Sequence, residues 1–307
     1  MKQAKFLLLT WAIALLAACG TTRTVPLTGR KQNLLVSNEE IMSLSNKEYT
    51  SYMQTAKKST NATNTALVQR VGQRLASAVE SYLRANGMAE EVKEYNWEFN
   101  LVQDNQANAF CMPGGKIVVY EGLLPYTQNE GGLAIVLGHE IAHAVAKHSA
   151  EQISQQYRQQ YGTQIVSGVL NAATGTNVGS YAAVLAQQGF KFRNLKYSRD
   201  HETEADRMGL IFAAMAGYDP QVAIPFWQRM SSGNSGGSDF LSDHPSDAKR
   251  IATLQQEMPT ALKYYQASGK ASASTTKKTS TTKTASGTKT STTKTVSASQ
   301  LYKNTKK

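Results

Sequence analysis

The segment His139-Glu140-Ile141-Ala142-His143 holds the residue types of a metal-dependent hydrolytic site. Residues four apart lie on the same face of an α-helix, so the two histidines would direct their imidazole nitrogens to one point. Two neutral imidazoles suit zinc, and a neighbouring glutamate can accept a proton from water without binding the metal. The alternative is a helix with two ordinary histidines. The apolar flanks favour the metal site, because buried histidines and a buried glutamate need partners.

The residues around this motif predict the helix that positions it. Residues 131–148 are apolar on nearly all sides, which is typical of a buried helix, and we expect the helix to continue past His148. His148 lies five residues after His143, about 140° around the helix axis. It cannot share a metal with His143, and we therefore predict a surface or capping histidine.

A second predicted helix supplies a third metal ligand. A catalytic zinc takes three protein ligands and keeps one position open. Glu202 and Asp206 share one face of a helix expected over residues 197–216. Glu202 can bind the metal, while Asp206 can accept a hydrogen bond from the free N–H of a ligating histidine. The alternative is an acidic helix start, with Glu204 paired to Arg207 on the wet face.

The segments that precede the motif predict two helices and a small β-sheet. Apolar periodicity indicates helices over about residues 37–57 and 64–86. Residues 95–101 alternate as a strand with one wet face, and a turn at residues 113–115 leads into a second strand. An open edge on that second strand would bind an extended substrate through backbone hydrogen bonds, whereas a plain core hairpin is the alternative. The strand consists of Lys116, Ile117, Val118, Val119 and Tyr120.

The N-terminus is typical of an exported protein. Residues 1–18 have a basic start, an apolar run that is short for a membrane span, and small residues before Cys19. The end of this segment resembles the bacterial lipoprotein processing box, which would make Cys19 the acylated first residue of the mature protein. Gly20, in place of aspartate, then implies the outer membrane. A plain signal peptide with an incidental cysteine is the alternative.

Charge and composition set the remaining boundaries. The net charge is +11, but residues 19–269 hold 22 basic and 22 acidic residues, so the folded part is neutral and predicts no nucleic-acid partner. We expect residues 19–35 to form a tether that docks on a metalloprotease domain over 36–268, followed by a Lys/Thr/Ser-rich disordered tail over 269–307. Cys111, the only other cysteine, is predicted to be a small buried hydrophobe.

Four segments together resemble the zinc metallopeptidase family of the CAAX prenyl endoprotease, and in particular its soluble Oma-type and BepA-type quality-control branch. They are the HExxH helix, SRDHETEAD over 198–206, NAFCMPGG over 108–115, and the His-Pro at 244–245 with an arginine six residues after the histidine. The resemblance implies a mainly helical α+β fold. It would have a zincin-like core, a small β-sheet, and the HExxH helix packed against the ExxxD helix.

The resemblance also implies the roles of individual residues. One Zn²⁺ per chain would be bound by His139, His143 and Glu202, with Glu140 as the general base and Asp206 orienting a ligand. It further implies that His244 approaches the metal or the reacting carbonyl and that Arg250 assists there. A turn histidine and a salt bridge at a helix start are the alternatives. Our hypothesis is that His244 occupies the open metal position in a resting form.

The predicted function is zinc-dependent endoproteolysis of unfolded or misassembled envelope proteins. The predicted location is the bacterial cell envelope, with the chain lipid-anchored through Cys19 in the outer membrane and facing the periplasm. The alternative is an envelope chaperone or assembly factor that binds outer-membrane clients and for which proteolysis is secondary.

Overall fold

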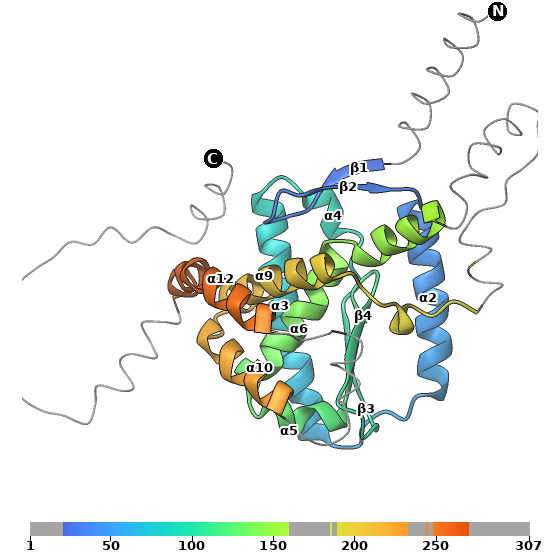
Figure 1. Cartoon of the computed structure of the whole chain (residues 1–307). Coiled ribbons are helices and arrows are strands. Elements are labelled where there is room, and N and C mark those ends of the chain that lie inside the picture. The colour runs from blue at the N-terminus through green and yellow to red at the C-terminus, as the bar shows by residue number, and fades with distance from the viewer. Residues whose placement is uncertain (1–20, 160–184, 186–188, 233–243, 245–247, 270–307) are drawn as a thin grey trace, which may run out of the picture.

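The computed structural model describes residues 21–159, 185, 189–232, 244 and 248–269 (Figure 1). This part of the chain is mainly helical with two small sheets, as expected for the predicted α+β class. The predicted signal peptide, Cys19 and the basic tail from residue 270 lie outside the described residues. Within the described part, no helix combines the length and the hydropathy needed to cross a lipid bilayer.

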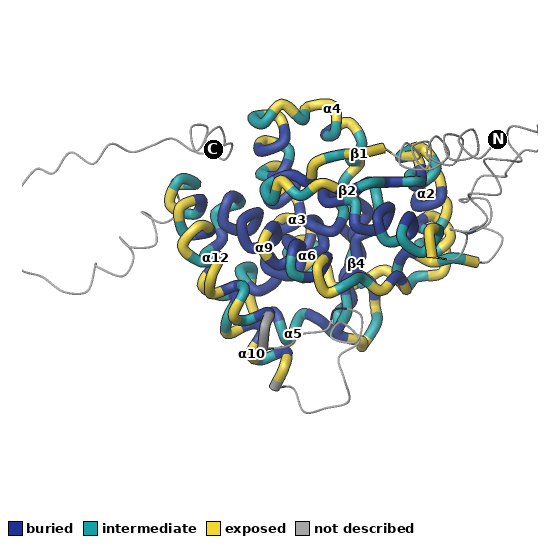
Figure 2. Tube along the Cα trace, turned by 45° about the horizontal axis from the view of Figure 1, so that its top comes forward, coloured by how far each residue is buried: buried dark blue, intermediate teal, exposed yellow. Residues whose placement is uncertain are grey.

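The helices surround one long buried helix, α6, which carries the HExxH motif (Figure 1). Figure 2 shows that α6 and α9 are buried along most of their length, whereas α4 is largely exposed. The α-helices are α2 (Asn38–Thr55), α3 (Ala62–Ala85), α4 (Ala89–Val92), α5 (Leu124–Thr127), α6 (Glu130–Val145), α9 (Arg199–Met215), α10 (Ala223–Ser232) and α12 (Ala248–Ala267). Short 3-10 turns lie at η1 (Glu121–Leu123), η2 (Phe192–Asn194) and η3 (Pro220–Val222).

Local signals in the sequence explain where the first two long helices begin. A capping box starts α2, in which Ser37 and Glu40 each accept a hydrogen bond from the other's backbone N–H. The side chain of Asn61 caps α3 in a similar way. Both helices predicted before the sheet are confirmed, and α3 packs against both α6 and the strand β3 (Glu98–Val102).

Helix α6 ends earlier than the sequence predicted. Asn129 caps its start by accepting a hydrogen bond from the Gly132 N–H at 3.0 Å. The helix ends at Val145, because Lys147 adopts a left-handed backbone conformation with φ 53°. Helical structure resumes from His148 to residue 159 in a new direction. The prediction of one continuous helix past His148 was therefore wrong.

The three-stranded sheet has the order β3-β5-β4. The strand β5 (Lys116–Tyr120) lies in the middle, parallel to β3 (Glu98–Val102) and antiparallel to β4 (Ala109–Met112). Both edges of β5 are paired, so it cannot bind a substrate strand. The prediction of an open edge on Lys116–Tyr120 was wrong, because the turn at residues 113–115 joins β5 to β4, and β3 takes the other edge.

Helices α6 and α9 cross in direct backbone contact at Gly138 and Gly209. A Cβ atom on Gly138 would lie 2.7 Å from the Gly209 carbonyl oxygen, and one on Gly209 would lie 2.6 Å from the His139 nitrogen. No side chain fits at either position. The two glycines therefore allow the HExxH helix and the ExxxD helix to approach closely, directly beside the first histidine of the motif.

The chain docks on the body from Thr21 onward, within the stretch predicted as a tether. The strands β1 (Thr21–Thr24) and β2 (Lys31–Leu34) pair antiparallel and form an N-terminal hairpin. Arg23 binds Glu91 at 2.6 Å and the carbonyl oxygen of Val145 at 3.3 Å. The N-terminal hairpin is thus attached to α4 and to the C-terminal end of α6.

Candidate active site

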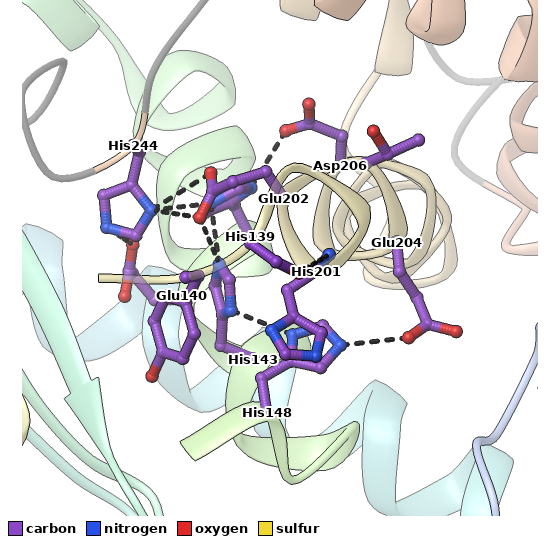
Figure 3. Close-up of polar contacts among 12 residues, drawn as sticks. His139, Glu140, His143, His148, His201, Glu202, Glu204, Asp206 and His244 are labelled. Atoms are coloured by element: carbon purple, nitrogen blue, oxygen red, sulfur yellow. Dashed lines mark hydrogen bonds and ion pairs between the residues drawn. The ribbon is translucent and has the colours of Figure 1, made fainter. Parts of the chain in front are cut away.

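Four buried side chains from three distant segments meet at one point (Figure 3). His139 and His143 come from α6, Glu202 comes from α9, and His244 follows later in the chain. Each offers one ligand atom, and these atoms all lie within 4.8 Å of one another. The structure therefore brings together the three predicted metal ligands and His244.

The contacts within this cluster are short. The Nε2 atoms of His139 and His143 lie 3.1 Å apart, and each lies 3.4 Å from an oxygen of Glu202. His244 Nδ1 lies 3.0 Å from Glu202 Oε1 and 3.2 Å from His139 Nε2. The four side chains converge on a space that one small cation can fill.

The Nδ1 atoms of His139 and His143 point away from the space between the four side chains. Asp206 Oδ2 accepts a hydrogen bond from Arg250 Nε at 2.6 Å, and its Oδ1 lies 2.9 Å from His139 Nδ1. His143 Nδ1 lies 2.9 Å from Nδ1 of His148. In the tautomers that carry their protons on these outward Nδ1 atoms, both Nε2 lone pairs face the Glu202 carboxylate. A group of acceptors needs a cation, and two imidazoles with one carboxylate suit zinc.

The electrostatics of the cluster favour positive charge at this point. Burial opposes charge on His139, but hydrogen bonds to Asp206 and Glu202 outweigh this effect and raise its pKa to about 9. Burial also opposes charge on Glu202, yet the nearby histidines hold the pKa of its carboxyl well below the usual value. Glu202 is thus an anion that requires positive neighbours.

Glu140 lies beside this cluster and keeps one oxygen available. Its Oε2 accepts a hydrogen bond from the Cys111 backbone N–H at 3.1 Å. Its Oε1 is buried, lies 3.5 Å from His244 Nε2, and has no hydrogen-bond partner among the residues that the structure describes. Burial raises the pKa of Glu140, which favours proton uptake. This oxygen is placed to accept a proton next to a metal.

The whole site lies within a region that matches a known protein family. The sequence model described as Peptidase family M48 matches residues 63–258. The chain belongs to peptidase family M48. The family predicted from the motifs and the mainly helical α+β fold are both confirmed.

Individual M48 relatives are similar over parts of their length. "Mitochondrial metalloendopeptidase OMA1" of Schizosaccharomyces pombe is 38% identical over 173 residues, which cover 55% of this chain and 49% of the relative. "Metalloendopeptidase OMA1, mitochondrial" of Homo sapiens is 32% identical over 249 residues, which cover 78% of this chain and 46% of the relative. "Beta-barrel assembly-enhancing protease" of Yersinia pestis is 33% identical over 182 residues, which cover 54% of this chain and 36% of the relative. The chain spans about half the length, or less, of these relatives.

In this M48 chain, Arg250 lies behind the cluster and not at an open reacting position. Its Nη2 donates to Glu202 Oε2 at 2.7 Å, and its Nε donates to Asp206 Oδ2 at 2.6 Å. The guanidinium lies over the Trp227 ring, 4.1 Å from the ring centroid. The sequence interpretation brought Arg250 to the site correctly, but this geometry suits holding two carboxylates in place and not contact with a reacting carbonyl.

The prediction for His148, and the alternative that paired Glu204 with Arg207 on the wet face, were both wrong. His148 is not a surface histidine: it is fully buried between His143 and Glu204, because the chain turns at Lys147 and brings it back toward α6. Glu204 is also buried and is not paired with Arg207, which binds Glu257 at 2.7 Å instead. Burial lowers the pKa of His148 to about 4. No local pattern in the sequence signalled these contacts.

Proposed function

We propose that the chain is a zinc-dependent metalloendopeptidase. The observation that carries this proposal is the buried Oε1 of Glu140, which accepts no hydrogen bond from the residues that the structure describes and lies beside the cluster of His139, His143 and Glu202. A purely structural metal site has no use for such a carboxylate. The OMA1 relatives are named as metalloendopeptidases, and these names support the same activity.

The residues divide the chemistry between them. His139, His143 and Glu202 would hold the zinc ion, which would supply a Lewis acid able to lower the pKa of a bound water to about 7 and to polarise a carbonyl group. Glu140 accepts the proton of the attacking water and then returns it to the leaving amine. Asp206 keeps the ring of His139 oriented, and Arg250 holds Asp206.

We place the substrate on the edge of β4 and not on β5. Within the described residues, β4 is an outer strand of its sheet and packs against α6. The Cys111 N–H points away from β5, because it donates to Glu140. An extended peptide along this edge would bring its backbone next to the general base.

The proposed substrates are unfolded or misassembled envelope proteins. The name "Beta-barrel assembly-enhancing protease" supports a role of this kind. We propose that Cys19 is lipidated and anchors the chain to the outer membrane, facing the periplasm. The OMA1 relatives are named as mitochondrial and do not support this location. The proposed location therefore rests on the N-terminal sequence.

Metal removal tests the proposed activity. The purified full chain is expected to contain about one zinc ion, and its cleavage of casein should stop when a chelator removes the metal. Activity should return when one equivalent of zinc is added, because the ligands come from a folded scaffold. The measurements are metal content and the rate of peptide release. A zinc-free chain that cleaves casein at the same rate would contradict the proposal.

His244 offers a second test, because its Nδ1 lies in the ligand cluster. We propose that it occupies the fourth metal position in a resting form. His244→Ala should then raise the initial rate of casein cleavage severalfold, since substrate no longer displaces a protein ligand. The rate should be measured on zinc-loaded protein. An unchanged rate contradicts the resting form, and a large decrease indicates that His244 assists the reaction instead.

A further inference from the structure

A second polar cluster lies behind His143, on the side away from Glu140 (Figure 3). His148 contacts His143 with one ring nitrogen, and its other nitrogen, Nε2, lies 3.0 Å from Glu204 Oε2. His148 is fully buried and Glu204 is nearly so. Burying a charged carboxylate and an imidazole is costly unless both are hydrogen-bonded, so this arrangement needs a purpose or a set of partners.

The partners of Glu204 come from the N-terminal hairpin. Arg30 donates from Nε to Glu204 Oε2 at 2.8 Å, and the hydroxyl of Thr28 donates to Oε1. The two terminal nitrogens of Arg30 each bind an oxygen of Glu151 at 2.7 Å. Glu204 is therefore held as an anion in one orientation by residues at the start of the described chain.

Counting donors and acceptors fixes the ring states along this chain of contacts. Glu204, held as a carboxylate by Arg30 and Thr28, has no hydrogen to donate, so His148 Nε2 is the donor in their contact. This contact directs His148 Nδ1 at His143 Nδ1, 2.9 Å away, where it can accept the proton of His143 Nδ1. His143 is left with its lone pair on Nε2, which faces Glu202 and His139.

The two histidines of the HExxH motif are thus supported by parallel arrangements. His139 is backed by Asp206 and then by Arg250. His143 is backed by His148, then by Glu204, and then by Arg30. Each series runs from an imidazole to a carboxylate to a guanidinium, and the second includes one extra ring.

We propose that His148 and Glu204, held by Arg30 of the N-terminal hairpin, are positioning residues that fix the ring state and orientation of His143 for zinc. The inference rests on the proposed zinc site and assigns part of it to the N-terminal hairpin. If His148 only filled space in the core, the shape of its ring would be sufficient. The proposed role also requires its Nδ1 atom as a hydrogen-bond acceptor for His143.

Zinc affinity of the full chain tests the proposal. The dissociation constant for zinc is measured by competition with a chelating dye. His148→Leu should weaken zinc binding about 10–100-fold, because the His143 Nδ1–H loses its acceptor. His148→Asn should stay within about threefold of wild type, because an amide oxygen can replace the imidazole nitrogen as acceptor. Glu204→Gln should weaken binding to an intermediate degree, because its neutral amide no longer matches Arg30.

A matched control separates zinc positioning from stability of the N-terminal hairpin. Glu91→Gln weakens a separate ion pair that attaches this hairpin, the one with Arg23, and it does not touch His148 or Glu204. It should leave zinc affinity unchanged. Thermal unfolding of the metal-free proteins shows whether each variant is folded.

Two results would overturn the proposal. One is His148→Leu binding zinc as tightly as wild type, and the other is His148→Asn binding as weakly as His148→Leu. Zinc affinity unchanged in Glu204→Gln would remove Glu204 and Arg30 from the proposed role. The test does not depend on hydrolysis, so a wild-type chain that binds zinc but cleaves nothing would contradict the proposed function alone.

Discussion

Glu140→Gln is expected to lower the rate of peptide hydrolysis by about 10²–10⁴-fold while zinc content stays at the wild-type level. The amide has the size of the carboxylate and can still accept the hydrogen bond from Cys111 N–H. It cannot take up a proton from water, so the reaction loses its base. The turnover number on a fluorogenic unfolded protein and the metal content of the same sample are the two measurements.

A control on the same helix makes this result specific. Glu130 lies in the first turn of α6, where it binds Arg70 at 2.6 Å near the surface. Glu130→Gln makes the same chemical change and should retain nearly full activity. If Glu140→Gln abolishes cleavage yet still fully supports assembly of outer-membrane proteins in cells, binding of clients is the main function and the assembly-factor alternative is correct.

Gly209→Ala is expected to disturb the metal site, although Gly209 itself is not a proposed ligand. The new Cβ would lie 2.6 Å from the His139 nitrogen and 2.8 Å from its Cα, and these backbone atoms cannot yield without moving α6. Overpacking of this kind costs about 1–3 kcal/mol of stability. A displacement of about 1 Å between α6 and α9 can cost about 10²-fold in rate, because Glu202 leaves its place beside the imidazoles. The midpoint temperature of thermal unfolding and the affinity for zinc should both decrease.

Gly131→Ala is the matched control for this substitution. Gly131 also lies on α6, but the nearest atoms to its new Cβ are side-chain atoms of Asn129 and Val222 at 3.2 Å, which can adjust. This variant should bind zinc normally. Wild-type zinc affinity in Gly209→Ala would show that the close crossing of α6 and α9 does not hold the ligands in register.

The parts of the site that the sequence predicted are those set by local geometry. Helical spacing places His139 beside His143, and Glu202 beside Asp206, whatever the rest of the fold does. The start of α2 was equally local, because its capping box lies within four residues.

The parts that the sequence did not predict depend on distant contacts or on a single backbone angle. The central place of β5 depends on pairing with β3, which is separated from it in sequence by β4. The burial of Glu204 depends on Arg30, 174 residues away. The turn at Lys147 occurs inside an apolar stretch that continues the helical pattern, so only the backbone conformation reveals it.

The N-terminal hairpin limits how far the body can stand from a membrane. Thr21, the first described residue, already pairs with Leu34, and it follows Cys19 by only two positions. Two extended residues span at most about 7 Å. If Cys19 is acylated, as we propose, this short connection would hold the folded body against the lipid surface, and the site would be reached only by substrates at that surface.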